Sequence, residues 1–312
     1  MPRRMLVIIV TLFTLLGSVP VGYGQHKGVL TPADCTQIQQ LYARYNDAID
    51  SGDAEAFAAC TIFRHMRSRA ARAIQGDPSR PVYLDEAARE TPVVAIGAAA
   101  REALRMADML EEMLLAARGA FNTEERKRVG EVRRMDDVLD RLNHAIKTYL
   151  TGLDAESTSD ADQRRIEQIL AFAINLEHAG DVVDKNLLDY AAKRLKRNII
   201  LSPEQREELS VTISRLVTNL RAAASVFMTE DVRAARVLAA EKEEFRKQEA
   251  VETEAHFAQI RAGQAHAAER SAWRLDLLRD LKRVNDHLVA AAAYPVLKDQ
   301  GELLPTRLRE NE

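Results

Sequence analysis

The chain has few of the residues that mark disulfide scaffolds and β-rich folds. Its two cysteines, Cys35 and Cys60, can form at most one disulfide, and then only in an oxidising compartment. Aromatic residues make up 5% of the 312 residues, and the 13 glycines and 9 prolines are few for that length. Because 46% of the residues are apolar and 29% are charged, the composition favours long amphipathic helices over strands.

The chain also has little net charge and no recognisable catalytic motif. The formal net charge is −3, so there is no global positive field to draw the protein onto nucleic acid. The sequence contains no Gly-rich phosphate loop and no recognisable Ser/His/Asp or Cys/His set. We therefore expect neither a nucleic-acid partner nor an enzymatic activity.

The amino terminus carries the one pronounced apolar run. Pro2-Arg3-Arg4 precedes the run Met5–Leu16, and small residues follow it up to Gly24. This order is typical of a secretory signal peptide, which we predict for residues 1–24. A membrane-spanning helix needs about 20 apolar residues, more than this run provides. An apolar helix in a cytosolic protein is the alternative interpretation.

The next two segments are short. Residues 25–62 are expected to be helical, and within them residues 31–60 resemble the opening helices of SnoaL-like proteins, which have an α+β fold. No alternating strand pattern follows, so we expect only a fragment of such a domain, without its catalytic residues. Residues 63–82 are first basic and then rich in turn formers, which predicts a linker.

Six long helical patterns occupy the rest of the chain. Their approximate ranges are 84–118, 123–152, 160–196, 203–228, 230–262 and 266–296. The third shows its apolar stripe most clearly, because Ile166, Ile169, Ala173 and Leu176 recur at alternating steps of three and four residues. Such stripes hold neighbouring helices together in a left-handed bundle. The sequence therefore predicts an all-α fold.

One sequence motif occurs twice. Asn-Leu-Glu-His-Ala-Gly-Asp at 175–181 returns as Asp-Leu-Lys-Arg-Val-Asn-Asp at 280–286. The spacing predicts two tandem three-helix bundles, the first over 83–198 and the second over 199–312. The second copy has a lysine, Lys282, where the first has a glutamate. We therefore expect any metal bound by these acids to be held by the first copy alone.

Acidic residues recur at the edge of two apolar stripes in the first copy. The candidate ligands are Asp136 and Asp140 in the second helix, and Glu177, Asp181 and Asp184 in the third. Residues four apart share a helix face, so each pair lies where a neighbouring helix approaches. Converging carboxylates repel one another unless a cation, a basic side chain or bound protons compensate them.

Two interpretations of these acids remain open. Facing carboxylates can bind a divalent or ferric metal ion such as iron, manganese, zinc or magnesium, and His144 and His178 are further donors, although a Glu-x-x-His signature is absent. Alternatively, the acids pair with arginines on solvated faces. Arg134, Arg141 and Arg165 are the arginines available for this.

The motif Glu177-His-Ala-Gly-Asp181 in a duplicated three-helix repeat resembles the signature of PhoU domains. Over about 83–310, the runs Tyr83-Leu-Asp-Glu-Ala, Leu275–His287 and Tyr294-Pro-Val-Leu297 resemble the C-terminal regulatory domain of sodium/phosphate cotransporter family proteins. Position by position, Asp136, Asp140, Glu177 and Asp181 match the acidic motifs of the first repeat. In the second repeat only Asp286 clearly does.

This resemblance implies a regulatory module linked to sodium-dependent phosphate transport and phosphate homeostasis. It also implies metal bound by the acidic pairs, a membrane phosphate transporter component as partner, and a cytoplasmic, membrane-associated location; a homodimer is a further expectation. Such cotransporters place membrane helices before the regulatory domain, where this chain has its signal-like and SnoaL-like segments. We therefore expect a non-transporting module. The alternative is an exported, periplasmic helical interaction protein with no metal and no phosphate role.

Overall fold

The computed structural model describes residues 77–122, 126–154, 158–196 and 201–302. The predicted signal peptide, the SnoaL-like fragment and most of the linker lie outside these residues. All regular secondary structure in the described ranges is helical, as the sequence predicted. Among these helices, none combines the length and the apolar character needed to cross a membrane.

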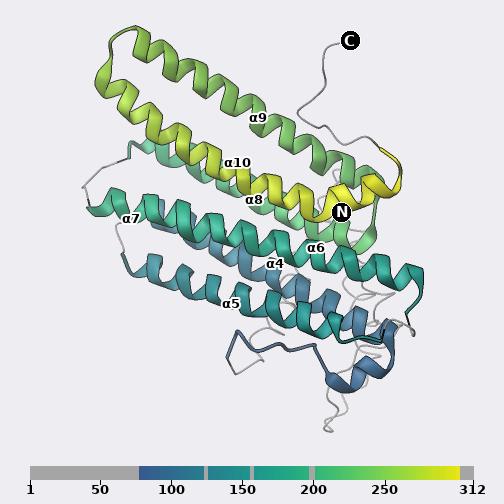
Figure 1. The fold of residues 1–312 in the computed structure, drawn as a ribbon. Helices are drawn as coiled ribbons and strands as arrows, with labels where there is room; N and C mark the ends of the chain where they lie inside the picture. The colour runs from purple at the N-terminus through teal and green to yellow at the C-terminus, as the bar shows by residue number, and fades with distance from the viewer. Residues whose placement is uncertain (1–76, 123–125, 155–157, 197–200, 303–312) are drawn as a thin grey trace, which may run out of the picture. The chain divides into compact units, whose positions relative to one another are not determined.

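Helices follow one another along the chain with short connections (Figure 1). They are η1 (Glu86–Glu90), α4 (Pro92–Asn122), α5 (Arg126–Thr151), α6 (Asp160–Val182), η3 (Val183–Leu188), α7 (Asp189–Lys196), α8 (Pro203–Thr229), α9 (Val232–Arg261) and α10 (Ala265–Asp299). η1 is a short 3₁₀ helix, and η3 is a π-helical turn that joins α6 to α7.

The first predicted helix is displaced at both ends. Its amino-terminal part is separated as η1, and α4 continues through Gly119 as far as Asn122. Glycine in a helix interior costs about 1 kcal/mol relative to alanine, which is why the sequence pattern suggested a break at Gly119. The following Ala120 and Phe121 are buried in the core, and their burial offsets that cost.

Local capping explains where three helices begin. Ser159 and Ser202 each form a reciprocal capping box, with Asp162 and Gln205 respectively, at the starts of α6 and α8. Asp231 caps α9 by accepting a hydrogen bond from the backbone N–H of Ala234. These side chains satisfy backbone donors that a helix end leaves without intrahelical partners.

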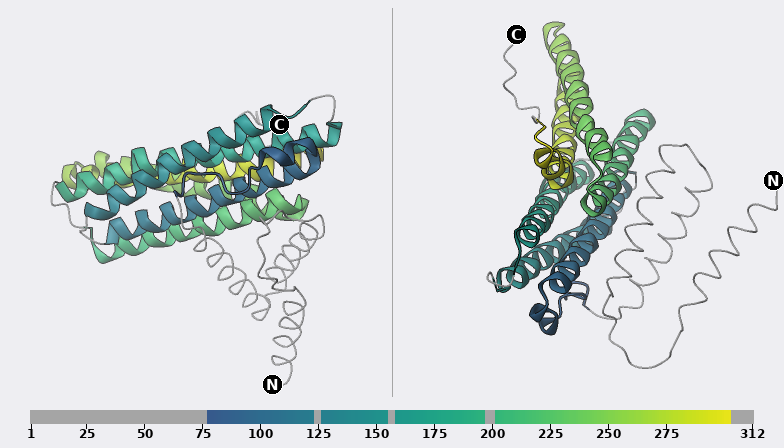
Figure 2. Two further views of the ribbon diagram at one scale, coloured as in Figure 1. Left: turned by 90° about the horizontal axis from the view of Figure 1, so that it is seen from below. Right: turned by 90° about the vertical axis from the view of Figure 1, so that its right-hand side faces the viewer.

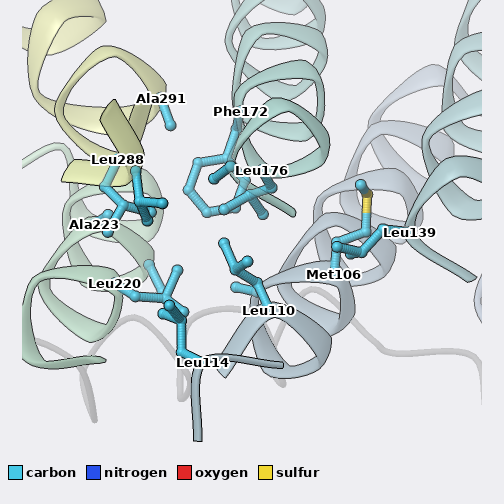
Figure 3. Packing of buried hydrophobic residues seen from close by; sticks show 14 of the residues in the cluster. Met106, Leu110, Leu114, Leu139, Phe172, Leu176, Leu220, Ala223, Leu288 and Ala291 are labelled. Carbon is cyan, nitrogen blue, oxygen red and sulfur yellow. The ribbon is translucent and has the colours of Figure 1, made fainter. Parts of the chain in front are cut away.

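Two three-helix bundles lie side by side and share one hydrophobic core (Figures 1 and 2). The first contains α4, α5 and α6, and the second contains α8, α9 and α10. They meet where α4 packs on α8 and where α6 packs on α10. Figure 3 shows part of the shared core: Met106, Leu110, Leu114, Leu139, Phe172, Leu176, Leu220, Ala223, Leu288 and Ala291. The predicted pair of tandem bundles is thus confirmed, with a joint interior.

Residues 77–85 are held against the first bundle, although the sequence assigned most of them to a linker. The backbone N–H groups of Val82 and Tyr83 donate to Glu102 Oε2 at 2.8 and 2.9 Å, and Glu102 is fully buried. The Tyr149 hydroxyl donates to the carbonyl of Asp85 at 2.8 Å. This segment, which we call the strap, is therefore part of the folded body.

Candidate metal centre

Three carboxylates meet on the edge between α5 and α6. Asp140 projects from α5, and Glu177 and Asp181 project from α6 at positions one turn apart. One oxygen of each lies within 4.8 Å of an oxygen of the other two. Asp140 is exposed and the other two are half-buried, so the group, which we call the acidic centre, is open to solvent.

A fourth carboxylate lies beside the acidic centre and is almost fully buried. Asp136, one turn before Asp140 on α5, is only 7% exposed. Its Oδ1 atom has no hydrogen-bond partner among the described residues. A buried carboxylate oxygen without a partner is costly, so a structure that keeps one normally compensates it in another way.

Charge repulsion and burial disfavour the ionised form of these acids. Burial, followed by the neighbouring charges of Asp140, Asp184 and Asp181, raises the pKa of Asp136 to about 7, and Lys185 only partly opposes this. Burial also raises the pKa of Glu177, with a smaller opposing effect from His178. A bound cation or bound protons would relieve the excess negative charge.

Asp184 does not join the acidic centre. It lies in the π-helical turn η3, with its side chain 15% exposed, and its Oδ1 atom is 3.7 Å from the Arg133 Nε atom. Burial raises its pKa, while Arg133 and Lys185 oppose the shift. Of the five predicted ligands, the structure thus brings three together, buries Asp136 beside them and turns Asp184 toward Arg133.

The three arginines considered as partners make their contacts elsewhere. Arg134 donates to the carbonyl of Gly130 at 3.2 Å, Arg141 to Ser79 Oγ in the strap at 2.8 Å, and Arg165 to the carbonyl of Phe227 at 2.9 Å. The sequence interpretation instead missed a lysine: Lys185 donates to Asp181. The spacing of four residues along one helix was the available signal for that pair.

The two histidines differ in their relation to the acidic centre. His178 Nε2 lies 3.5 Å from a Glu177 oxygen, and its ring packs edge-on against His287 of α10, with 5.3 Å between the ring centroids. His144 is exposed on α5 and is not part of the acidic centre. The donors that converge here are therefore all carboxylate oxygens.

The donor set fits a hard cation. Magnesium binds oxygen at about 2.0–2.1 Å and calcium at about 2.3–2.6 Å, so ligand oxygens on opposite sides of such an ion are about 4–5 Å apart. The 4.8 Å spread of the three oxygens requires little side-chain movement to reach that arrangement. Oxygen-only sites suit magnesium and manganese better than zinc, which prefers nitrogen and sulfur donors.

Solved structures identify the class of fold. The crystal structure of PhoU from Pseudomonas aeruginosa aligns with a TM-score of 0.58 and 19% identity, covering 68% of this chain and 99% of that one. The phosphate transport system regulatory protein PhoU from Streptococcus pneumoniae aligns with a TM-score of 0.59 and 15% identity, covering 69% and 100%. At this identity the likeness concerns the fold alone.

Sequence comparison adds a domain and its relatives. Residues 103–185 match the PhoU domain, which confirms that part of the prediction. The chain is 34% identical to "Putative inorganic phosphate export protein YjbB" of Escherichia coli K12 over 223 residues, and to that of Salmonella typhimurium LT2 over 225 residues. Each match covers 72% of this chain and 41% of the relative, so the chain spans about two fifths of these proteins.

Proposed function

We propose that this chain is a regulatory, non-transporting and non-enzymatic module of phosphate transport, controlled by a cation in its first bundle. The relatives named for phosphate export and the PhoU domain support the link to phosphate. Cation binding is supported by one observation: a buried oxygen of Asp136 has no hydrogen-bond partner beside three convergent carboxylates. Lys185 pairs with Asp181 and offsets only part of the negative charge, and a divalent or ferric ion supplies the rest.

Each acid has a distinct role in this proposal. Asp140, Glu177 and Asp181 hold the ion through one oxygen each, and Asp136 is stabilised in its ionised form by the nearby positive charge. Because the ligands come from two helices, the ion joins α5 to α6 at this edge. A change in ion occupancy then alters how firmly α5 is held, which is a route by which a partner bound to α5 can sense it.

The proposed partner is a membrane component of a phosphate transporter, contacted from the cytoplasmic face of the membrane, with a homodimer as the proposed assembly. The relatives named for phosphate export support a partner in phosphate transport, and the cytoplasmic face is what the cotransporter-like runs of the sequence imply. Fractionation of cells carrying a carboxy-terminal tag tests it: recovery with the cytoplasmic membrane is expected. Recovery from the periplasm would overturn it in favour of an exported interaction protein.

Elemental analysis of purified protein tests whether these acids bind a metal ion. Wild type is expected to retain about one metal ion per chain, and the double variant Glu177→Ala plus Asp181→Ala is expected to lose it. A matched control replaces two exposed acids of the same helices, Asp137→Ala plus Glu167→Ala, and should keep the ion. An equal metal content in wild type and the first double variant would show that Glu177 and Asp181 do not bind the ion.

A further inference from the structure

A lysine ammonium group lies between carboxylates at the corresponding edge of the second bundle. Lys282 Nζ in α10 is 3.4 Å from Glu249 Oε2 in α9 and 3.6 Å from Asp286 Oδ2 one turn further along α10. The Lys282 side chain is only 19% exposed. The charged group is thus held in the helix interface and does not extend into solvent.

The two edges correspond at two positions in sequence and at a third by contact. The repeated motif places Lys282 at the position of Glu177 and Asp286 at that of Asp181. Glu249 contacts Lys282 from the neighbouring helix, as Asp140 approaches Glu177 in the first bundle. The second edge therefore has a trio of charged side chains like that of the acidic centre, with a lysine in place of a glutamate.

The residue one turn before the trio on the neighbouring helix also differs between the two edges, and it too is less acidic in the second. One turn before Glu249 on α9 stands Phe245, which is fully buried, whereas one turn before Asp140 stands the buried Asp136. The second edge therefore has no acid at the position of Asp136, where an apolar ring requires no compensating charge. Its own buried oxygen without a hydrogen bond, Asp286 Oδ1, has the Lys242 ammonium group 3.7 Å away.

Further cations complete the neutralisation of the second edge. Lys242 Nζ lies 3.7 Å from Asp286 Oδ1 and 3.0 Å from the Tyr294 hydroxyl. Burial lowers the pKa of Lys242, but the contacts with Tyr294 and Asp286 outweigh burial, and its pKa is raised overall. Arg279 Nε donates to Glu249 at 3.2 Å. The acids of this edge are thus paired with covalently attached cations.

We propose that Lys282 is a permanent internal cation that takes the place of a metal ion in the second bundle. The chain then has a single exchangeable metal site, and metal removal loosens α5 against α6 while α9 and α10 stay paired. This inference rests on the proposed function in one respect, because it requires a metal ion in the first bundle. A tethered ammonium group, unlike a free ion, remains in place at any metal concentration.

Manganese titration tests this by calorimetry and elemental analysis. Wild type and Lys282→Gln are expected to bind one Mn²⁺ per chain, because glutamine removes the ammonium group without adding a charged ligand. Lys282→Glu restores the full carboxylate trio and is expected to bind two. In a Glu177→Ala plus Asp181→Ala background, Lys282→Glu is expected to bind one.

The outcomes separate this inference from the proposed function. Two ions in wild type, or no added site in Lys282→Glu, would overturn the role of Lys282 while leaving metal binding by the first bundle intact. No ion in wild type but one in Lys282→Glu would remove the proposed function and support the internal cation. Circular dichroism confirms that each variant is folded before titration.

Hydrogen exchange on wild type provides a test that needs no variant. Chelation of manganese is expected to speed amide exchange in α5 and α6 around the acidic centre, with exchange in α9 and α10 around Lys282 unchanged. Equal acceleration at both edges would show that the second bundle also depends on metal and would overturn the proposal.

Discussion

The backbone of Gly180 in α6 lies directly against the Asp136 carboxylate of α5. A β carbon built on Gly180 would stand 3.2 Å from Asp136 Oδ1 and 2.6 Å from Leu139 Cδ1. The absence of a side chain at this position is therefore what allows α5 to approach α6 closely. The same approach brings the acids of the two helices together.

Gly180→Ala is expected to lower the free energy of unfolding by up to about 2 kcal/mol. Alanine has a better helix propensity than glycine by about 1 kcal/mol, but overpacking a core costs about 1–3 kcal/mol. A β carbon would stand only 2.6 Å from Cδ1 of the fully buried Leu139, so we expect overpacking to prevail. Gly97→Ala in α4 is the control, because a β carbon there meets nothing within 4 Å. Denaturant unfolding should show that this control is stabilised by about 0.5–1 kcal/mol.

Asp136→Asn is expected to remove part of the pH dependence of stability in metal-free protein. A carboxyl whose pKa is about 7 when folded, and ordinary when unfolded, binds more protons in the folded state between those values. The stability that protonated Asp136 contributes to the folded state is therefore fully present below about pH 4 and is lost as the pH rises through 7. Unfolding midpoints measured from pH 4 to 8 with chelator present should fall less steeply in the variant.

The matched control for this pH series is Asp137→Asn, the exposed acid next along α5. It should reproduce the wild-type slope. An Asp136→Asn slope identical to wild type would show that Asp136 ionises normally in the folded protein. Since a nearby metal ion favours the ionised form of Asp136, whose pKa is about 7, manganese affinity in wild type should also rise with pH up to about 7.

Glu102→Gln is expected to loosen the strap at Val82 and Tyr83, while Tyr149 still holds it at Asp85. The Glu102 carboxylate pairs with Arg105 as well as accepting the N–H groups of Val82 and Tyr83. Hydrogen bonds to a charged partner contribute about 1.5–3 kcal/mol each, and glutamine offers a weaker, neutral acceptor. Amide exchange at Val82 and Tyr83 should accelerate. The exposed Glu90→Gln serves as control, and equally slow strap amides in both variants would contradict the prediction.

Asn219→Ala is expected to weaken the second bundle by about 1–3 kcal/mol. Asn219 Nδ2 donates to Glu241 Oε2 at 3.0 Å and to Asn285 Oδ1 at 2.8 Å, so it links α8 to α9 and α10. Its removal leaves a fully buried Asn285 with fewer partners. Thermal unfolding provides the measurement. Thr218→Ala, which removes an exposed hydroxyl bonded only within α8, should stay within about 0.5 kcal/mol of wild type.

Local patterns were sufficient for the helices but not for their details. The apolar stripe of 160–196 correctly predicted one long helical stretch, yet it gave no sign of the π-helical turn at Val183–Leu188. A π-helical turn is wider than an α-helical one and rotates the residues in it. Asp184 was therefore expected on the face of Asp181 but is directed toward Arg133.

The sequence alone determined the all-α fold, the doubled bundle and the exchange of Glu177 for Lys282, because these depend on periodicity and residue type along the chain. Only the tertiary structure decided which acids meet, that Asp136 is buried, and that Lys282 lies between Glu249 and Asp286. The physical reason is that burial and charge proximity arise from the packing of one helix on another. That packing depends on close approaches, such as the one at Gly180, that no single stripe of residues specifies.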